Sequence, residues 1–432
     1  MLGLALGAVY VPCAGPVLTA IAVAGATGRI GVQTVLLTVA FAIGTAAPLL
    51  GFALAGRRVA ERVRAFRRRQ RGVQVVAGVV VIGLAVALTF NVTDFLQRAV
   101  PDYTAALNKV LDGAGPLLDP GRSQSLEECA ALPSDQLANC GMAPPIVGID
   151  QWLNTAGAQP VDTTGKVVLV DFWAYSCINC QRAIPHVQAW YSAYAADGLE
   201  VIGVHTPEYA FEQVPDNVAA GAARLHITYP IAIDNEYATW DSFTNDSWPA
   251  EYLIDATGTI RHVAIGEGEY GVTESLIRQL LTAANPAVTL PSATDVADTT
   301  PTDTGQSPET YLGAARAQYF VDGPLSPGTA SFHYPESIPA DAFALNGTWT
   351  VSDEDLTSGP SAGIELDFAA DDVYLDVGGT GTLTAHFAGH TSTYQVSGAP
   401  NIYPVVSGTQ QVSGLLTIEL SPGLQAYSFT FG

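Results

Sequence analysis

The alternation of hydrophobic and polar positions divides the 432-residue chain into a membrane part and two folded parts. Three long apolar runs open the chain, at residues 2–26, 30–55 and 73–90, and each is near the ~20 residues that a helix needs to cross a bilayer. The pattern therefore predicts three transmembrane helices within residues 1–93. A cleaved signal peptide is the alternative for the first run, but that run lacks a basic start and two more apolar runs follow it directly.

Residues 151–285 alternate between the periods of strands and helices, which predicts an α/β domain with a mixed sheet. The predicted elements are strands at 167–172 and 199–204, a helix at 180–196, a hairpin formed by 252–254 and 260–265, and a last helix at 275–284. Residues 94–150, which precede this domain, are rich in turn-forming residues and are interpreted as a tether with a loosely structured entry.

The end of the chain alternates apolar and polar residues between Gly, Pro and Asp turns, a spacing that is typical of an all-β sandwich at 307–432. Strands are predicted at 343–351, 363–368, 373–377, 382–387, 391–396, 415–420 and 426–431. Residues 286–306 have a Pro-, Thr-, Asp- and Ser-rich composition with little to bury, which predicts a flexible linker.

The charge distribution gives the membrane part an orientation. The formal net charge is −23 at pH 7, yet eight of the eighteen Lys and Arg residues fall between Arg57 and Arg71, in the loop after the second apolar run. The positive-inside rule places that loop in the cytoplasm, so we expect a multi-pass cell-membrane protein in contact with lipid, with its soluble domains on the extracytoplasmic side. The acidic remainder repels phosphate backbones, which excludes nucleic acid as a partner.

The five cysteines fall into three groups, Cys13, then Cys129 with Cys140, then Cys177 with Cys180. In an oxidising compartment Cys129 and Cys140 are predicted to form a structural disulfide, with a second redox relay as the alternative. Cys177 and Cys180 form a C-x-x-C motif between a strand and a helix. The start of a helix stabilises a thiolate, so Cys177 is predicted to attack and Cys180 to resolve. A zinc site would need two more ligands at metal spacing, so we expect no metal and no cofactor beyond a redox-active disulfide.

The residues around this motif resemble the thioredoxin superfamily, because Val-Asp-Phe-Trp-Ala precedes it and a proline follows the second cysteine by five residues. The resemblance implies that Asp171 exchanges a proton with Cys180, that Trp173 packs beside the disulfide, and that Pro249 is the cis-proline opposite the cysteines. The ordinary alternatives are a hydrogen-bonding aspartate, a core tryptophan and a turn proline.

Longer phrases resemble the DipZ-type branch of the TlpA-like thioredoxins, among them Val-His-Thr-Pro-Glu at 204–208 and Gly-Glu-Gly-Glu-Tyr at 266–270. By this resemblance, 307–432 has the jelly-roll shape of a carbohydrate-binding module. Four aromatic residues could form a glycan platform or belong to the core: Tyr374, Phe387, Tyr394 and Tyr403.

The Pro-Cys phrase around Cys13 resembles the motif of the CcdA and DsbD membrane domains, which implies a membrane relay at a residue otherwise interpreted as inert. That family has two such half-units, whereas this sequence matches only the second. We expect a truncated start, with a separate chain or pairing between copies as alternatives.

Together these features predict an enzyme that passes electrons from cytoplasmic thioredoxin through Cys13 to Cys177 and Cys180. The electrons would then reduce disulfides in exported proteins, in cytochrome c maturation or disulfide repair. The alternatives are a thiol peroxidase and a non-enzymatic surface protein that binds through its β domain.

Overall fold

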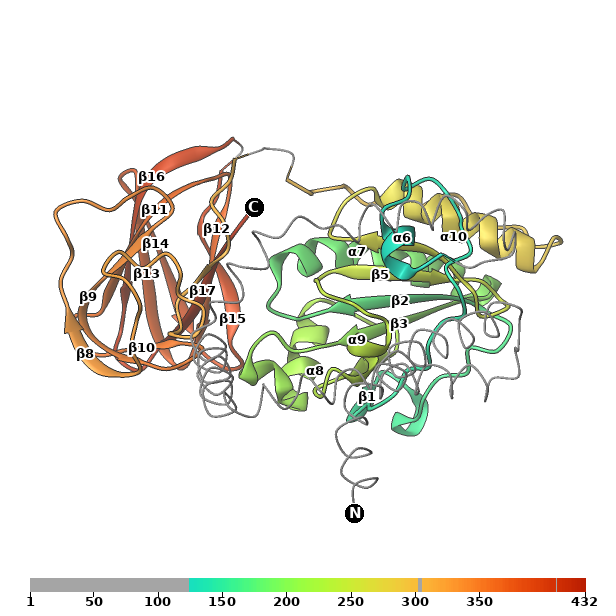
Figure 1. Cartoon of the computed structure of the whole chain (residues 1–432), viewed down its shortest axis with the longest axis horizontal. Coiled ribbons are helices and arrows are strands. Elements are labelled where there is room, and N and C mark those ends of the chain that lie inside the picture. Colours follow the sequence, from blue (N-terminus) through green and yellow to red (C-terminus); the bar gives the residue numbers. More distant parts are fainter. Residues whose placement is uncertain (1–123, 302–304, 409) are drawn as a thin grey trace, which may run out of the picture. The chain divides into compact units, whose positions relative to one another are not determined.

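The structure is a computed structural model that describes residues 124–301, 305–408 and 410–432 (Figure 1). The three predicted spans and Cys13 lie outside these residues. Among the residues described, no helix has both the length and the apolar character needed to cross a membrane.

The first folded part is a thioredoxin-like domain built on a six-stranded mixed sheet with the order β1-β4-β3-β2-β5-β6. Its strands are β1 (Gln151–Leu153), β2 (Val167–Trp173), β3 (Leu199–His205), β4 (Ile231–Ile233), β5 (Ala250–Ile254) and β6 (Ile260–Ile265). The central strand β2 runs parallel to β3 and antiparallel to β5. Every residue of β2 is buried, which is why the strand reads as a nearly continuous apolar run.

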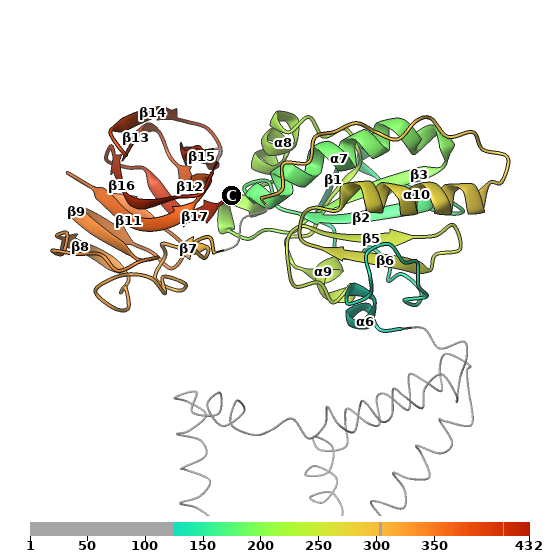
Figure 2. The ribbon, with the colours of Figure 1, turned by 90° about the horizontal axis from the view of Figure 1, so that it is seen from above.

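Helices cover both faces of this sheet (Figure 2). The helices are α6 (Leu126–Ala130), α7 (Ile178–Tyr194), α8 (Pro215–Arg224), α9 (Ala238–Ser242) and α10 (Tyr270–Ala284). The alternating residues Val167, Leu169 and Trp173 of β2 join the core formed with α7, α8 and α10. The intervening Val168, Val170 and Phe172 join the opposite core with α9. Asp171 is therefore the polar position of β2 on the α7 face.

Residues 124–150, the described part of the predicted tether, are held by a disulfide and by backbone hydrogen bonds. Cys129, in α6, and Cys140 are joined in a disulfide with their Cα atoms 6.0 Å apart. The backbone N–H of Cys140 donates to the carbonyl of Ile260 (3.0 Å), and that of Ala138 donates to the carbonyl of Arg261 (2.8 Å). Residues 138–140 thus pair with the edge strand β6, where unpaired backbone groups were available.

The segment after α10 has no helix or strand up to residue 301, but it is held against the domain. The N–H of Thr294 donates to Oε1 of Glu274 (2.7 Å), and the carbonyl of Pro291 accepts from Arg278 (2.7 Å). The predicted linker 286–306 therefore includes residues that follow α10 closely, because polar side chains of the helix satisfy its backbone.

The second folded part is a β domain in which the described strands pair antiparallel in one continuous order, β14-β13-β16-β11-β9-β10-β17-β12-β15, with β7 beside β17 and β8 beside β9. Its strands are β7 (Thr310–Tyr311), β8 (Gly328–Phe332), β9 (Phe343–Val351), β10 (Leu356–Ser358), β11 (Gly363–Ala370), β12 (Val373–Gly378), β13 (Gly381–Phe387), β14 (His390–Val396), β15 (Asn401–Val406), β16 (Val412–Leu420) and β17 (Gln425–Phe431). Alternate residues of these strands, such as Ile364, Leu366 and Phe368 of β11, point into one apolar core.

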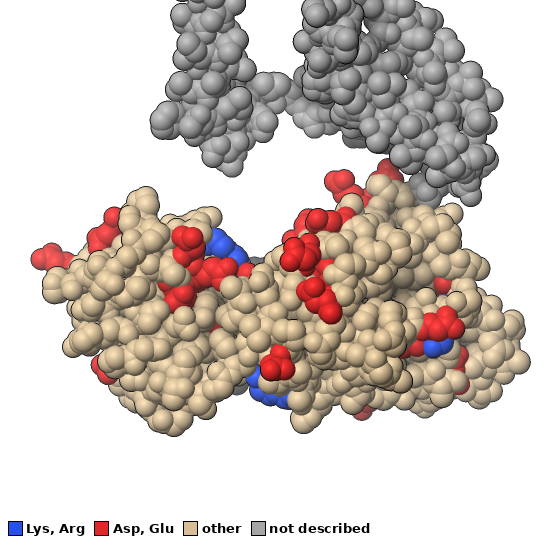
Figure 3. Space-filling view, turned by 90° about the horizontal axis from the view of Figure 1, so that it is seen from below, with Lys and Arg blue, Asp and Glu red and all other residues tan. Residues whose placement is uncertain are grey.

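Acidic residues are distributed over the face in Figure 3, where basic residues are few. The surface therefore keeps the negative character that the sequence indicated for the described part of the chain.

Candidate active site

The two cysteines of the C-x-x-C motif lie where β2 passes into α7. Cys177 is the N-cap of α7, and its Sγ accepts a hydrogen bond from the backbone N–H of Cys180 (3.3 Å). Both are free thiols; Cys177 is half-buried and Cys180 is fully buried. An unpaired amide of the helix start thus points at the Cys177 sulfur, and only Cys177 of this pair reaches the surface.

A groove of about 290 Å³ lies beside Cys177. The thioredoxin-like domain lines it with residues 176–179, Glu208, Tyr209 and residues 246–248, and the β domain contributes Glu309, Tyr311, Arg316, Ser428 and Thr430. The Arg316 guanidinium pairs with Glu208 (2.7 Å), and the Tyr311 hydroxyl donates to the same carboxylate (2.7 Å). The attacking sulfur thus faces an opening that both domains border.

Asp171 lies on the α7 face of the sheet, beneath the buried cysteine. Its side chain is 1% exposed, and burial raises the pKa of this carboxyl to about 7. The Tyr229 hydroxyl lies 3.5 Å from Oδ2 of Asp171. Burial also raises the pKa of the Cys180 thiol, with smaller contributions from Cys177 and Asp171. Cys180 therefore holds its proton, and Asp171 is a suitable acceptor near neutral pH.

Glu251, on β5, is a second buried acid on this face that the sequence analysis missed. It pairs directly with Asp171 in the register of β2 and β5 and is 6% exposed. Burial, followed by the nearby Asp171, raises the pKa of Glu251 to about 8. The indication in the sequence was a glutamate inside the otherwise apolar strand Ala-Glu-Tyr-Leu-Ile.

Trp173 is fully buried in the core that also contains Cys180, so it packs behind the motif rather than in the groove. Its ring meets that of His205 edge-on, with centroids 5.0 Å apart. His205 Nε2 accepts from the N–H of Tyr175 (3.3 Å), in the turn before Cys177. Burial lowers the pKa of His205 to about 3, so this imidazole is neutral.

The peptide between Trp248 and Pro249 is cis, and it lies immediately before β5. Trp248 lines the groove beside Cys177 together with Asp246 and Ser247. The carbonyl of Pro249 accepts from the N–H of Gly266 (2.9 Å), at the end of β6. The fold thus brings this segment, far from Cys177 in the sequence, to the same groove.

Glu212 fixes the turn that precedes Cys177, and sequence reasoning did not identify it. Its Oε1 accepts from both the N–H (3.1 Å) and the hydroxyl (2.9 Å) of Ser176, while Oε2 accepts from the N–H of Glu208 (2.7 Å). Burial raises the pKa of Glu212 to about 7. Glu212 lies 36 residues after Ser176, beyond α7 and β3, so nothing local in the sequence indicated this contact.

The remaining candidates, Tyr374 among them, do not line the groove at Cys177. Cys129 and Cys140 are closed in their disulfide. Among the residues that the structure describes, no group of three or more His, Cys, Asp or Glu side chains could hold a metal. Phe387, Tyr394 and Tyr403 are partly buried against the core of the β domain.

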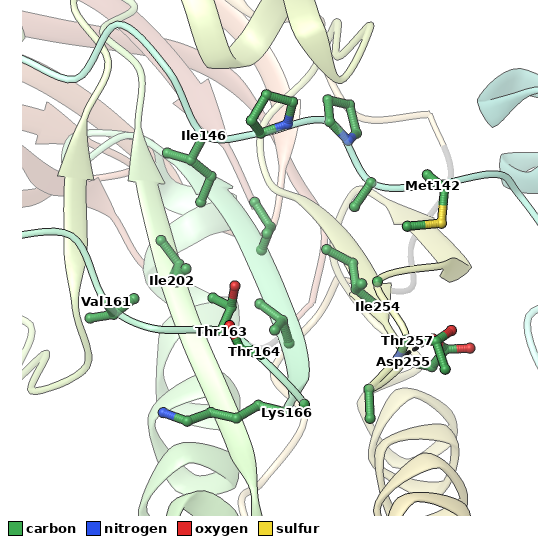
Figure 4. Close-up of a pocket in the computed structure, with 18 of the residues that line it drawn as sticks. Met142, Ile146, Val161, Thr163, Thr164, Lys166, Ile202, Ile254, Asp255 and Thr257 are labelled. Carbon is green, nitrogen blue, oxygen red and sulfur yellow. Dashed lines mark hydrogen bonds between the residues drawn. The ribbon is translucent and has the colours of Figure 1, made fainter. Parts of the chain in front are cut away.

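A cavity of about 500 Å³ opens elsewhere on the thioredoxin-like domain (Figure 4). Its lining is mainly aliphatic, including Ile146, Val161 and Ile202, and contains no cysteine or histidine. Lys166 at this cavity is paired with Glu200 (2.6 Å). Since this cavity has no cysteine and its lysine is held in an ion pair, the groove at Cys177 is the better candidate for thiol chemistry.

A thioredoxin-like fold with a C-x-x-C at a helix start and a cis-proline beside it defines the class of thiol–disulfide oxidoreductases. Comparisons with known proteins agree: a model of the AhpC/TSA family matches residues 154–263, and a model described as Thioredoxin like C-terminal domain matches residues 307–432. The Bacillus subtilis thiol-disulfide oxidoreductase YkuV is 33% identical over 138 residues, 32% of this chain and 93% of that protein.

Protein DipZ of Mycobacterium bovis is 54% identical over 447 aligned residues, which cover 100% of this chain and 64% of that protein. The same values hold for Protein DipZ of Mycobacterium tuberculosis, so the chain spans about 64% of the length of these relatives. A solution structure of a thioredoxin-like protein in the oxidized form is 29% identical with a TM-score of 0.30, covering 34% of this chain and 97% of that one. The chain belongs to the thioredoxin-like thiol–disulfide oxidoreductases, and it is similar to Protein DipZ along its whole length.

Proposed function

We propose that this protein is a membrane-anchored, extracytoplasmic oxidoreductase that reduces disulfide bonds in exported proteins. The observation that carries the proposal is the placement of Cys177, half-buried at the N-cap of α7 and facing a groove, over a buried Cys180 and a buried acid. A redox-active dithiol of this kind needs no bound cofactor.

The geometry supports a two-step exchange. The Cys177 thiolate attacks one sulfur of the substrate disulfide, a bond forms between them, and the other substrate sulfur leaves as a thiolate that takes a proton from solvent. Cys180 then gives its proton to Asp171 and attacks the Sγ of Cys177, so the second substrate sulfur leaves. The substrate gains two electrons, and the Cys177–Cys180 pair is oxidised to a disulfide.

The membrane part would regenerate the dithiol. Residues 1–93 carry the three apolar runs and the Arg-rich loop, and Cys13 lies in the Pro-Cys phrase. We propose that electrons pass from cytoplasmic thioredoxin through Cys13 and a second membrane cysteine to the oxidised pair. In cells that express Cys13→Ser, this route predicts that Cys177 and Cys180 accumulate as a disulfide, which alkylation and gel shift would detect. An unchanged redox state of the pair would contradict the route.

The proposed substrates are folded or unfolded exported proteins with accessible disulfides, apocytochrome c among them. A glycan ligand for the β domain is a further proposal, supported only by the aromatic side chains of Tyr394 and Tyr403, whose ring centroids lie 5.6 Å apart. Binding of soluble oligosaccharides, measured by calorimetry on the full chain, tests it separately from the redox chemistry.

A thiol peroxidase is the second candidate, because the AhpC/TSA family model matches residues 154–263. In that case Cys177 would attack peroxide, and turnover of hydrogen peroxide would exceed turnover of protein disulfides. The C-x-x-C spacing favours disulfide exchange, since Cys180 is already placed one helical turn from the attacking sulfur.

The deciding experiment compares insulin-disulfide reduction and peroxide consumption by the full chain, purified in detergent and supplied with dithiothreitol. We expect insulin reduction by the wild type, its loss in Cys177→Ser, and little peroxide turnover in either. Equal insulin reduction by the two proteins would instead favour a non-enzymatic binding protein.

A further inference from the structure

The acid beneath Cys180 has a partner on the neighbouring strand. Asp171 of β2 and Glu251 of β5 are directly opposed in the antiparallel register. Directly opposed residues point to the same face with Cβ atoms about 4.5–5.5 Å apart. Both side chains are buried, at 1% and 6% exposure. Two carboxyl groups therefore share one enclosed site below the resolving cysteine.

The groups around this site come from each packed element. Cys180 belongs to α7, Tyr229 precedes β4, and Tyr270 belongs to α10. Burial is the main cause that raises the pKa of Cys180, Tyr229 and Tyr270. Asp171 adds to the shifts of Cys180 and Tyr229, and Glu251 adds to those of Tyr229 and Tyr270, which places both acids near these groups. On β6, His262 pairs with Leu253, which lies on the same face of β5 as Glu251.

Other buried glutamates of this domain have evident structural partners. Glu200 pairs with Lys166 (2.6 Å), and Glu274 accepts from the N–H (2.7 Å) and hydroxyl (2.9 Å) of Thr294. Glu251 instead faces another carboxyl in an otherwise apolar strand, where Leu253 shows that an apolar side chain is accommodated. Burying an acid against an acid costs stability, so packing alone does not explain Glu251.

We infer that Glu251 is a positioning residue for the resolving step, which pairs with Asp171 so that the two carboxyls together accept the proton of Cys180 and then hold it between them. The inference rests on the proposed function. The base is the doubly ionised pair. The Cys180 proton moves to Asp171, the pair then holds one proton and one negative charge, and the Cys180 thiolate attacks the Sγ of Cys177, releasing the substrate sulfur.

The benefit of a pair lies in its basicity. Two carboxyls this close do not ionise independently, so the last proton leaves at a higher pH than it would from either group alone. Burial raises the pKa of Asp171 to about 7 and that of Glu251 to about 8. A stronger base is a better match for a thiol that burial makes hard to ionise.

Stopped-flow reaction of the reduced full chain with the aromatic disulfide DTNB separates the two steps, because the first thiolate is released by Cys177 and the second by Cys180. In the wild type we expect the rate of the second phase to rise with pH as the carboxyl pair ionises and then to reach a plateau; the rising part of this profile is called the limb. In Glu251→Gln the lost negative neighbour lowers the pKa of Asp171, so the limb moves by ~1 pH unit to lower pH and the plateau is slower. The first phase keeps its rate.

Glu200→Gln is the matched control, since it removes a buried carboxyl of the same type that is held in an ion pair and lies opposite Val168, on the other face of the sheet from Asp171; its second phase should follow the wild type. Glu251→Asp keeps an acid and should keep the limb within a few tenths of a unit. A Glu251→Gln profile that coincides with the wild type in limb and plateau overturns the inference.

An infrared difference titration, the reduced wild type minus Glu251→Gln or minus Asp171→Asn, is independent of turnover, and other buried acids such as Glu212 cancel in the difference. A protonated carboxyl band in the difference spectrum that persists above pH 6.5 and is lost by about pH 9 is expected, and its absence also overturns the inference. If the second thiolate is never released, the proposed function fails, while this titration still decides whether the carboxyl pair exists.

Discussion

Two pairs of cysteines occur in the described part of the chain, and their surroundings differ in each respect that governs sulfur chemistry. Cys129 and Cys140 are joined, 2% and 5% exposed, and held by a short helix and by backbone pairing with β6. Cys177 and Cys180 are free thiols at the start of a helix of seventeen residues, with a groove on one side and acids on the other.

The difference shows that a dithiol becomes reactive through its neighbours. At Cys177 an amide N–H points at the sulfur and the groove admits a partner, while Asp171 lies behind Cys180 to take a proton. The disulfide between Cys129 and Cys140 lies in the opposite core, packed among residues such as Trp152 and Ile260. The pair Cys129–Cys140 thus stabilises the fold, whereas the pair Cys177–Cys180 exchanges electrons.

The largest expected effect comes from removing the attacking sulfur. Cys177→Ser should lower insulin-disulfide reduction by at least ~10³-fold, because a serine oxygen does not form the mixed disulfide. The matched variant is the double substitution Cys129→Ala with Cys140→Ala, which should keep activity within a factor of ~3 at a temperature where it is folded. A comparable loss in both proteins would erase the distinction between the two pairs.

Removing the resolving sulfur should trap the first step. Cys180→Ser keeps the N-cap sulfur and its amide donor from residue 180, so attack continues, but release of the bound substrate is lost. Mixed disulfides with substrate proteins should accumulate and be visible on non-reducing gels and by mass spectrometry. If Cys180→Ser turned over insulin at the wild-type rate, Cys180 would not be the resolving residue.

The sequence allowed the motif and its surrounding elements to be predicted because the information there is local. An apolar run of strand length ends at the C-x-x-C, and β2 covers the predicted residues with one addition, Trp173. The placement of Cys177 at the start of a helix was predicted from the motif, and Cys177 is the N-cap of α7; the helical period itself was recognised only from residue 180, two residues after the observed start at Ile178. Strict alternation likewise gave β9 its observed bounds, Phe343–Val351.

Contacts that depend on register and long-range packing could not be predicted in this way. The opposition of Asp171 and Glu251 requires knowledge of which strands pair and with what offset. The hydrogen bonds of Glu212 to Ser176 span 36 residues. Helix α8 was missed because its sequence, Pro-Asp-Asn-Val-Ala-Ala-Gly-Ala-Ala-Arg, has few large apolar residues, and β15 because Pro404 interrupts its pattern.

Loss of the disulfide between Cys129 and Cys140 should lower stability rather than turnover. The disulfide links residues 11 apart, and closing a loop of about this size stabilises a fold by roughly 2–4 kcal/mol. Replacing both Cys129 and Cys140 by Ala should therefore lower the free energy of unfolding by about that amount, measured by urea denaturation of the full chain. The wild type treated with a strong reductant is the control and should lose a similar amount; an unchanged midpoint in both would show that the loop is held without the disulfide.

The free energy of unfolding should also depend on pH through Asp171, the buried acid beneath Cys180, with a smaller effect. Burial raises the pKa of Asp171 from 3.8 to about 7, so between these values the folded protein holds a proton that the unfolded chain has released. Stability from this group therefore falls as pH rises from about 4 to 7 and then levels off. Asp171→Asn removes the penalty, so it should change the free energy of unfolding little at pH 4 and raise it by on the order of 1–3 kcal/mol at pH 8. The exposed Asp135→Asn should show no such dependence, and an Asp171→Asn effect that is equal at both pH values would mean that this carboxyl is already ionised when buried.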